Sequence, residues 1–109
     1  MATFFRNKVI KEIGTSPVEV LRLDQNTRAT VIGMSITNLI EENVLASVLV
    51  EDDASITGFY IKDTLIPVNS TLKALNGGEK LIIAPENALF ISSNQESSID
   101  LILSYVEVV

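Results

Sequence analysis

The chain has 109 residues, 47% of them hydrophobic and 20% charged, with a net charge of −6 and a pI near 4.5. This length predicts one domain with a single core, and the acidic balance excludes the clustered basic surface that binding to a nucleic-acid backbone requires. Cysteine and histidine are absent, which excludes disulfides, thiolate catalysis and zinc sites built from these residues.

Hydrophobic side chains are abundant for so small a chain, and the mean hydropathy is positive at +0.35. A small domain has too much surface to bury them all alone, so the surplus predicts that another chain covers part of the surface. The opening MATFFRNKVIKEIG lacks the apolar core of a signal peptide, and no run approaches the roughly 18 apolar residues of a membrane helix. We therefore expect a protein that is made in the cytoplasm and stays soluble or assembles there, with no membrane partner.

Residues 1–13 are rich in β-branched and aromatic side chains, which favour a first strand or an extended N-terminal arm. Apolar residues also recur there at loose helical spacing, so a helix over residues 3–13 is the alternative. Residues 14–17, GTSP, predict a turn before a further strand in VEVLRL.

The stretch TVIGMSI, residues 30–36, alternates with the period of a strand. This period places Ile32, Met34 and Ile36 together on one face. Residues 44–50 are apolar on both faces, which predicts a central strand or one covered on two sides.

Residues 38–49 would also suit a helix by propensity. The polar Glu41–Asn43 and the neighbouring Val and Ile residues favour a turn followed by a strand instead.

Residues 55–63 predict a strand with Phe59 and Tyr60 on opposite faces. Gly58 indicates a bulge or a close backbone approach. Pro67 cannot donate to a sheet hydrogen bond, so we expect it at an edge, a bulge or a strand end.

The last third alternates apolar runs with turns. Residues 76–78, Asn-Gly-Gly, lie between two apolar runs and predict a β-hairpin. Turns are expected at 85–87 and 94–98. The final strand divides into a face with Ile99, Leu101, Leu103 and Tyr105 and a face with Asp100, Ile102, Ser104 and Val106.

Seven to nine strands follow one another at intervals of about 8–12 residues with turn chemistry between them. The sequence therefore predicts an all-β protein, an antiparallel β-sandwich of jelly-roll or immunoglobulin-like type. We expect residues 1–109 to form a single domain, with 1–13 as either an extended arm or the first strand.

The sequence contains few residues that could act in catalysis. A Ser–Lys pair is formally open, but Lys62, Lys73 and Lys80 fall at solvent-facing positions, and a nucleophile needs a desolvated base. We predict that the chain is not an enzyme and needs no cofactor.

Two stretches suggest ligand sites. Glu51–Asp53 with Asp63 is a carboxylate cluster, but it lacks the ligand alternation and the glycine of a calcium loop, so a charged turn is favoured over a weak calcium site. Gly77 and Gly78 are not followed by a phosphate-binding helix, so a turn is favoured there over a phosphate cradle.

The N-terminal segment joins adjacent aromatic residues to basic ones in an otherwise acidic chain. Two neighbouring side chains of a strand cannot both point inward, so one of the two aromatics faces outward or toward a partner. We predict a protein interface there, made by Phe4, Phe5, Arg6, Lys8 and Lys11.

Residues 28–109 resemble a group of small structural proteins encoded by tailed bacteriophages. The shared features are an early strand ending in a polar turn with Asn, a Val-rich strand, a Pro-x-x-Ser/Thr-x-Leu step, a Gly-x-Lys-Leu hairpin and a final strand ending in Ser-Tyr-x-Glu. In this chain the last three motifs include Pro67, Leu72, Lys80, Leu81, Ser104, Tyr105 and Glu107.

The resemblance implies a β-sandwich that assembles in symmetric copies on a virion and has no catalytic residues. We therefore predict a bacteriophage virion structural protein, made in the host cytoplasm, that acts as a capsid decoration (cement) protein. Its partners would be further copies, as a trimer or another symmetric ring, and the major capsid protein or other virion proteins. The alternatives are a neck or tail accessory protein, a host-surface carbohydrate-binding module, which the absence of Trp argues against, and an enzyme of unrecognised type.

Overall fold

The computed structural model describes residues 2–75 and 78–109, and every regular element in this part of the chain is a β-strand. The strands are β1 (Thr3–Ile13), β2 (Val18–Arg22), β3 (Arg28–Asn38), β4 (Val44–Glu51), β5 (Thr57–Ile66), β6 (Thr71–Lys73), β7 (Leu81–Ile83), β8 (Ala88–Ser93) and β9 (Ile99–Val108). Within the described residues, no helix is long and apolar enough to cross a membrane. The predicted all-β fold with seven to nine strands is confirmed.

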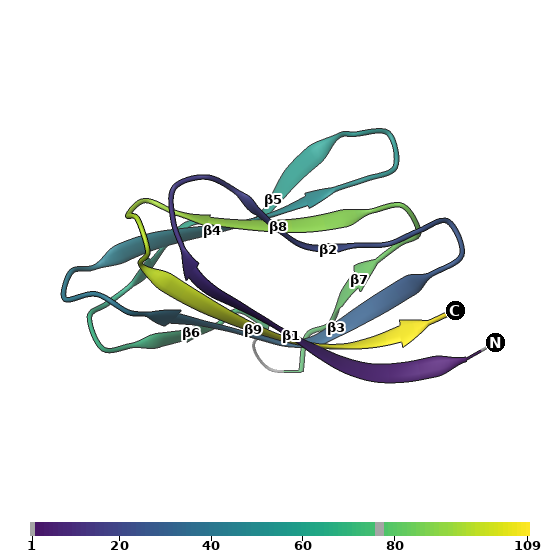
Figure 1. Ribbon diagram of the computed structural model, residues 1–109, viewed down its shortest axis with the longest axis horizontal. Helices are drawn as coiled ribbons and strands as arrows, with labels where there is room; N and C mark the ends of the chain where they lie inside the picture. The colour runs from purple at the N-terminus through teal and green to yellow at the C-terminus, as the bar shows by residue number, and fades with distance from the viewer. Residues whose placement is uncertain (1, 76–77) are drawn as a thin grey trace.

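The strands form two antiparallel sheets that stack as the two layers seen in Figure 1. Sheet A has the order β1-β9-β3-β6, with β7 also paired to β3, and sheet B has the order β2-β8-β4-β5. Since β6 and β7 line successive parts of the same edge of β3, they act as one interrupted strand. Apart from β4 and β5, which pair within sheet B, successive strands then alternate between the two sheets in jelly-roll order, so the jelly roll is the correct one of the two predicted types.

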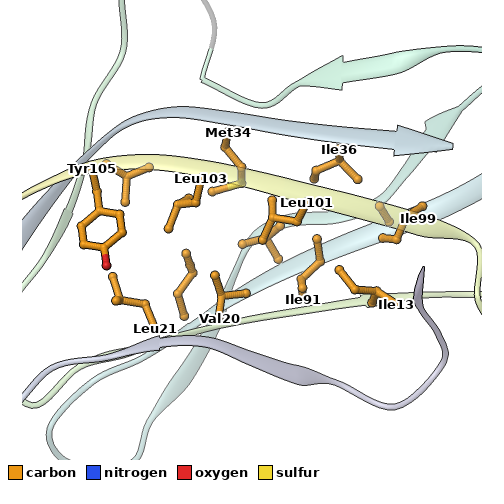
Figure 2. Close-up of a cluster of buried hydrophobic side chains, with 14 of the residues drawn as sticks. Ile13, Val20, Leu21, Met34, Ile36, Ile91, Ile99, Leu101, Leu103 and Tyr105 are labelled. Atoms are coloured by element: carbon orange, nitrogen blue, oxygen red, sulfur yellow. The ribbon is translucent and has the colours of Figure 1, made fainter. Parts of the chain in front are cut away.

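The core lies between the two sheets and is apolar throughout (Figure 2). Sheet A supplies the inward side chains of β3 and β9, and sheet B supplies those of β2, β4 and β8. Its members include Val20, Leu21, Val31, Met34, Ile36, Val44, Val48, Leu89, Ile91, Ile99, Leu101, Leu103 and Tyr105. The predicted division of β9 into a core face and an opposite face is confirmed, and β4 is central as predicted, between β8 and β5.

The prediction for β3 is wrong at Ile32, which faces out of the core while Met34 and Ile36 are buried. Val31 pairs with Tyr105 and Gly33 pairs with Ser104, so β3 advances two residues where β9 advances one. This β-bulge inserts one extra residue and shifts the alternation of side chains. Ile32 is the extra residue, and the bulge moves it to the outer side of sheet A.

The predicted hairpin between the apolar runs on either side of residues 76–78 is also wrong. Asn76 and Gly77 lie outside the described residues, but the strands that flank them, β6 and β7, each pair antiparallel with β3 and not with one another. Both runs therefore point in the same direction along the edge of sheet A.

β5 agrees with its prediction except at Gly58. Phe59 is exposed and Tyr60 packs against the core, on the opposite face. Gly58 pairs with Val50 between two regular pairs, and no atom lies within 4 Å of the position a Cβ would take, so neither a bulge nor a close approach occurs there. β5 ends at Ile66, so Pro67 follows a strand end as predicted.

One buried amide holds together several turns at one end of the sandwich. The Asn38 side chain is buried at the end of β3, and its Nδ2 donates to the carbonyl oxygens of Glu42 at 2.8 Å and Ile66 at 3.0 Å. Its Oδ1 accepts from the Ile40 backbone N at 2.9 Å. These bonds hold the β3–β4 turn, which contains the predicted polar residues Glu41–Asn43, against the end of β5.

A carboxylate joins the two remaining connections at the same end. The backbone N of Thr15 donates to Glu96 Oε1 at 2.8 Å, and the Thr15 hydroxyl donates to the same oxygen. These two donors hold the pKa of Glu96 below its ordinary value, the hydroxyl having the larger effect. A Cβ on Gly14 would lie 2.9 Å from this carboxylate, so glycine suits the close approach of the β1–β2 turn to the β8–β9 turn.

The N-terminal segment forms a strand from Thr3 to Ile13 and is not a helix. β1 forms one edge of sheet A and pairs with β9 from Thr3, opposite Val108, to Ile13, opposite Ile99. Beyond the strands, Ala2 and Val109 exchange two backbone hydrogen bonds of 3.1 and 2.9 Å, and the two ends of the chain lie side by side in Figure 1.

Candidate assembly surface

The lysines considered as catalytic bases lie at the surface. Lys62 is exposed, and its ammonium lies 5.3 Å from the centre of the Phe59 ring. Lys73 Nζ donates to Ser35 Oγ at 3.0 Å on the outer side of sheet A. Lys80 is exposed as well, whereas a lysine that acts as a base needs a desolvated site.

The carboxylate cluster after β4 is a turn. Asp52 Oδ1 accepts from the backbone N of Ala54 and of Ile56, both at 2.9 Å, and so closes the β4–β5 connection. Glu51 Oε1 accepts from Arg22 Nη2 at 3.3 Å. In the part of the chain that the structure describes, no three Asp or Glu side chains are grouped as metal ligands. The geometry agrees with the charged turn that the sequence favoured.

The outer side of sheet A is a broad surface with apolar side chains and no charge at its centre; we call it the A face. Strand pairing fixes its membership, because residues opposite one another in antiparallel strands share a side. Its central residues are Phe5, Asn7 and Val9 of β1, Ile102, Ser104 and Val106 of β9, Thr30, Ile32, Gly33 and Ser35 of β3, and Ile82 of β7. Strand pairing places three charged side chains, Arg28, Lys73 and Asp100, at its margins.

Several apolar side chains of the A face are open to solvent. Phe5 is 81% exposed, Ile82 is 69% exposed and Val9 is 58% exposed. Ile32 and Ile102 are also exposed. Apolar groups gathered on one side of a sheet, without charges among them, have the composition of the centre of a protein interface.

A groove of about 490 Å³ opens beside Phe5. Its lining residues are Phe5, Arg6, Asn7, Ile32, Ser104 and Tyr105. Small side chains stand opposite one another at its level, since Ser104 of β9 pairs with Asn7 on one side and with Gly33 on the other. Four of the six lining residues, Phe5, Asn7, Ile32 and Ser104, belong to the A face, so this face has a projecting aromatic ring next to a hollow.

The outer side of sheet B differs because charged groups stand among its apolar ones. Arg22 lies over the Phe90 ring and pairs with Glu19 at 2.7 Å and with Glu51 at 3.3 Å. The Glu19 and Glu51 partners keep the pKa of Arg22 above its ordinary value. Burying this surface against an apolar partner would cost the hydration of all three charges.

The five predicted interface residues fall on different sides of β1. Phe5 belongs to the A face. Phe4, Arg6 and Lys8 share the opposite side, because they stand opposite Glu107, Tyr105 and Leu103 of β9. Lys11 lies in the bulge that separates Ile10 from Ile13.

Arg6 already has partners within the chain. Its Nε donates to Glu107 Oε1 at 3.0 Å, and its guanidinium lies 4.8 Å from the centre of the Phe4 ring. Arg6 and Lys8 both lie on the inward side of an edge strand, an arrangement that discourages a further strand from adding to that edge. The structure therefore favours contact through the outer side of β1 over contact along its edge.

Most of the A face lies outside the predicted set. Ile102 and Val106 could have been found from the sequence, since the alternation in β9 already placed them opposite the core face. Ile32 and Ile82 could not, because their exposure depends on the β3 bulge and on the pairing of β7 with β3.

No protein-family model and no curated protein matches the chain. Among solved structures, it is similar to a protein of Bacillus endospore appendages, which form a novel family of disulfide-linked pili, with a TM-score of 0.56 and 6% identity over 96% of this chain and 86% of that chain. It is also similar to a chain of the acid-stable capsid of Helicobacter pylori bacteriophage KHP30, with a TM-score of 0.54 and 9% identity over 100% of this chain and 94% of that chain.

A chain of the infectious bursal disease virus Gx strain matches with a TM-score of 0.47 and 10% identity over 95% of this chain and 36% of that chain. The matches to the appendage protein and to the phage capsid chain, at 6% and 9% identity, show a shared fold. The chain therefore has a β-sandwich fold that occurs in a phage capsid chain and in a pilus chain. Since this chain contains no cysteine, the disulfide linkage of those pili is not open to it.

Proposed function

We propose that the chain is a non-enzymatic structural component of a bacteriophage virion. The observation that carries this proposal is the A face, an uncharged and partly apolar sheet surface of the kind that protein contacts cover. The fold that it shares with a phage capsid chain supports the proposal. The resemblance of residues 28–109 to small tailed-phage structural proteins points the same way.

Within the virion, we assign the chain to the capsid as a decoration (cement) protein. In this role symmetric copies, as a trimer or another ring, would cover junctions between subunits of the major capsid protein. The dimensions of 45 × 26 × 22 Å suit a small unit that sits on a larger shell. A neck or tail accessory position is the alternative, and it differs in the virion protein on which the copies would sit.

The carbohydrate-binding alternative has no specific observation in its favour. Sugar-binding sites present aromatic platforms, and the exposed aromatic side chains Phe4, Phe5 and Phe59 stand on β1 and β5, not on the connecting turns.

The proposal is tested on particles. The phage whose genome encodes the chain is propagated, its virions are purified on a density gradient, and their proteins are quantified by mass spectrometry. A capsid decoration protein is expected in a copy number of the same order as the major capsid protein, whereas a neck or tail protein would be present in far fewer copies. Absence of the chain from intact virions would refute the virion role.

A second arm tests the surface. Virions made with Phe5→Asp should contain less of the chain, because a carboxylate replaces the most exposed apolar side chain of the A face. Phe59→Asp is the matched control, since Phe59 is an exposed aromatic residue on the edge strand of sheet B. Equal loss with both variants would remove the A face from the proposal.

A further inference from the structure

We infer that the A face is self-complementary and binds the A face of a second copy about a twofold axis, with Phe5 of each copy in the groove of the other. The inference deepens the proposed function, on which it rests for the expectation that many copies meet. It names a partner, a second copy of this chain, and the symmetry of the contact.

The first argument is that the A face has both a projecting side chain, Phe5, and a groove beside it. In a twofold contact each copy offers the same patch, so the patch must contain both a projection and a place to receive it. Phe5 is 81% exposed, and the groove that it borders is about 490 Å³ in volume, which is ample for an aromatic ring. Asn7, Ser104 and Gly33 give this level of the sheet its small side chains.

The second argument is charge. Each copy carries a net charge of −6, so most pairings of identical surfaces would bring like charges together. The central residues of the A face include no charged side chain, and a contact between two A faces therefore buries no unpaired charge. Arg28 and Lys73 stand at the margin with Asp100, where water still solvates them.

The same criterion disfavours the other pairings. Stacking the A face on the outer side of sheet B would desolvate the Glu19–Arg22–Glu51 group against apolar side chains. Pairing along the free edge of β1 would bring Lys8 of each copy to the junction, on the inward side of the strand.

The third argument is size. The molecule measures 45 Å along its longest axis and 22 Å along its shortest, and the two sheets stack along the third axis, which is vertical in Figure 1. A sheet face of these outer dimensions offers on the order of 1,000 Å², and a stable interface of standard size covers about 800 Å² of each partner. The A face is therefore large enough for a stable pair without help from the turns.

Purified protein tests the pairing without any particle. Analytical ultracentrifugation over a concentration series should show a dimer for the natural sequence. Phe5→Asp should weaken the dimer at least tenfold, and Phe59→Asp should leave it unchanged. Because Phe5 is largely exposed in the single chain, the circular dichroism spectrum should keep its natural shape, which shows that the variant is folded.

Cross-linking tests the geometry of the pair. Because the natural chain has no cysteine, each cysteine variant carries a single thiol. Ser104→Cys places a single thiol beside the groove on the inner strand β9, and Ser92→Cys places its matched control on the outer side of the inner strand β8. A short bis-maleimide should join two copies of the Ser104→Cys protein and leave the Ser92→Cys protein monomeric.

Three outcomes would overturn the inference: a monomer at every concentration, a dimer that Phe59→Asp disrupts and Phe5→Asp does not, or cross-linking through position 92 alone. A monomer that still enters virions in a Phe5-dependent way would overturn self-pairing and keep the virion role, since the A face would then meet another virion protein. A dimer that is absent from virions would keep self-pairing and overturn the virion role.

Discussion

Replacing Asn38 by Ala should be among the most damaging single changes outside the apolar core. The Asn38 side chain is buried, and its Nδ2 bond to the Ile66 carbonyl oxygen, at 3.0 Å, is buried as well. The bonds to the Glu42 carbonyl oxygen and from the Ile40 N are partly buried. Nδ2 also donates to the Pro67 carbonyl oxygen at 3.2 Å, so alanine would leave three carbonyl oxygens and one N–H without these partners.

The magnitude follows from these groups. A buried polar group that loses its partner costs about 1–3 kcal/mol, and a partly solvated one costs less. One buried and three partly buried losses give a decrease of about 2–4 kcal/mol in the free energy of unfolding. In a domain of this size a change of 1 kcal/mol lowers the melting temperature by about 4–8 °C, so a decrease of about 10 °C or more is expected.

The assay is thermal and urea unfolding followed by circular dichroism, with Asn43→Ala as the control. Asn43 lies at the other end of the same turn and accepts one exposed bond, from the Val68 N at 3.3 Å, so its loss should cost about 1 kcal/mol or less. Equal destabilisation by both variants would show that the buried amide contributes nothing beyond an ordinary turn contact, and would refute the argument.

Three further outcomes are expected. Thr15 lowers the folded-state pKa of Glu96, so the stability that Glu96 provides is present above the ordinary pKa of a Glu side chain and is lost as the pH falls through the lowered value. The melting temperature of Glu96→Gln should therefore fall less steeply with acid than that of the natural protein. Parallel curves of melting temperature against pH would contradict this. Leu103→Ala removes a fully buried side chain and should lower the free energy of unfolding by about 2–5 kcal/mol in urea titration; a loss below 1 kcal/mol would mean that the site is not packed as described. Chelation with EDTA should leave the melting temperature unchanged, because Asp52 already accepts two backbone N–H groups; a decrease of several degrees would reveal a bound ion.

The sequence predicted the fold best where one periodic pattern decides the side of the strand. In β9 the alternation separates Leu103 from Ile102 without any knowledge of the neighbours, and the structure agrees. In β3 the same reasoning failed at Ile32, because a bulge depends on how Gly33 and Val31 pair with another strand. A period of two cannot detect an extra residue whose cause lies about 70 residues further along the chain.

Local turn chemistry has a related limit. Gly78 has a positive φ of 83°, in keeping with the turn that the sequence predicts at this point. The turn chemistry does not say which strands the flanking runs join, and here β6 and β7 both join β3.

The candidate site shows the same division between local and distant information. Adjacent aromatic residues correctly implied that one of them faces outward, and in β1 both are accessible, on opposite sides. The charge pattern of Arg6 and Lys8 suggested a partner chain, but Arg6 pairs with Glu107 of β9. A pairing between residues 101 positions apart could not be predicted from the composition of the first segment.

The strand order also determines when folding can occur during synthesis. β9 lies between β1 and β3 in sheet A, and β8 lies between β2 and β4 in sheet B, so each of these two inner strands leaves the ribosome after both of the strands that it joins. Until then β1 and β3 have no shared neighbour, and the apolar runs of a nascent chain remain unprotected. Long-range pairing of this kind folds slowly. A cell making many copies at once would therefore hold a pool of unfolded chains whose size depends on the rate at which translation is completed.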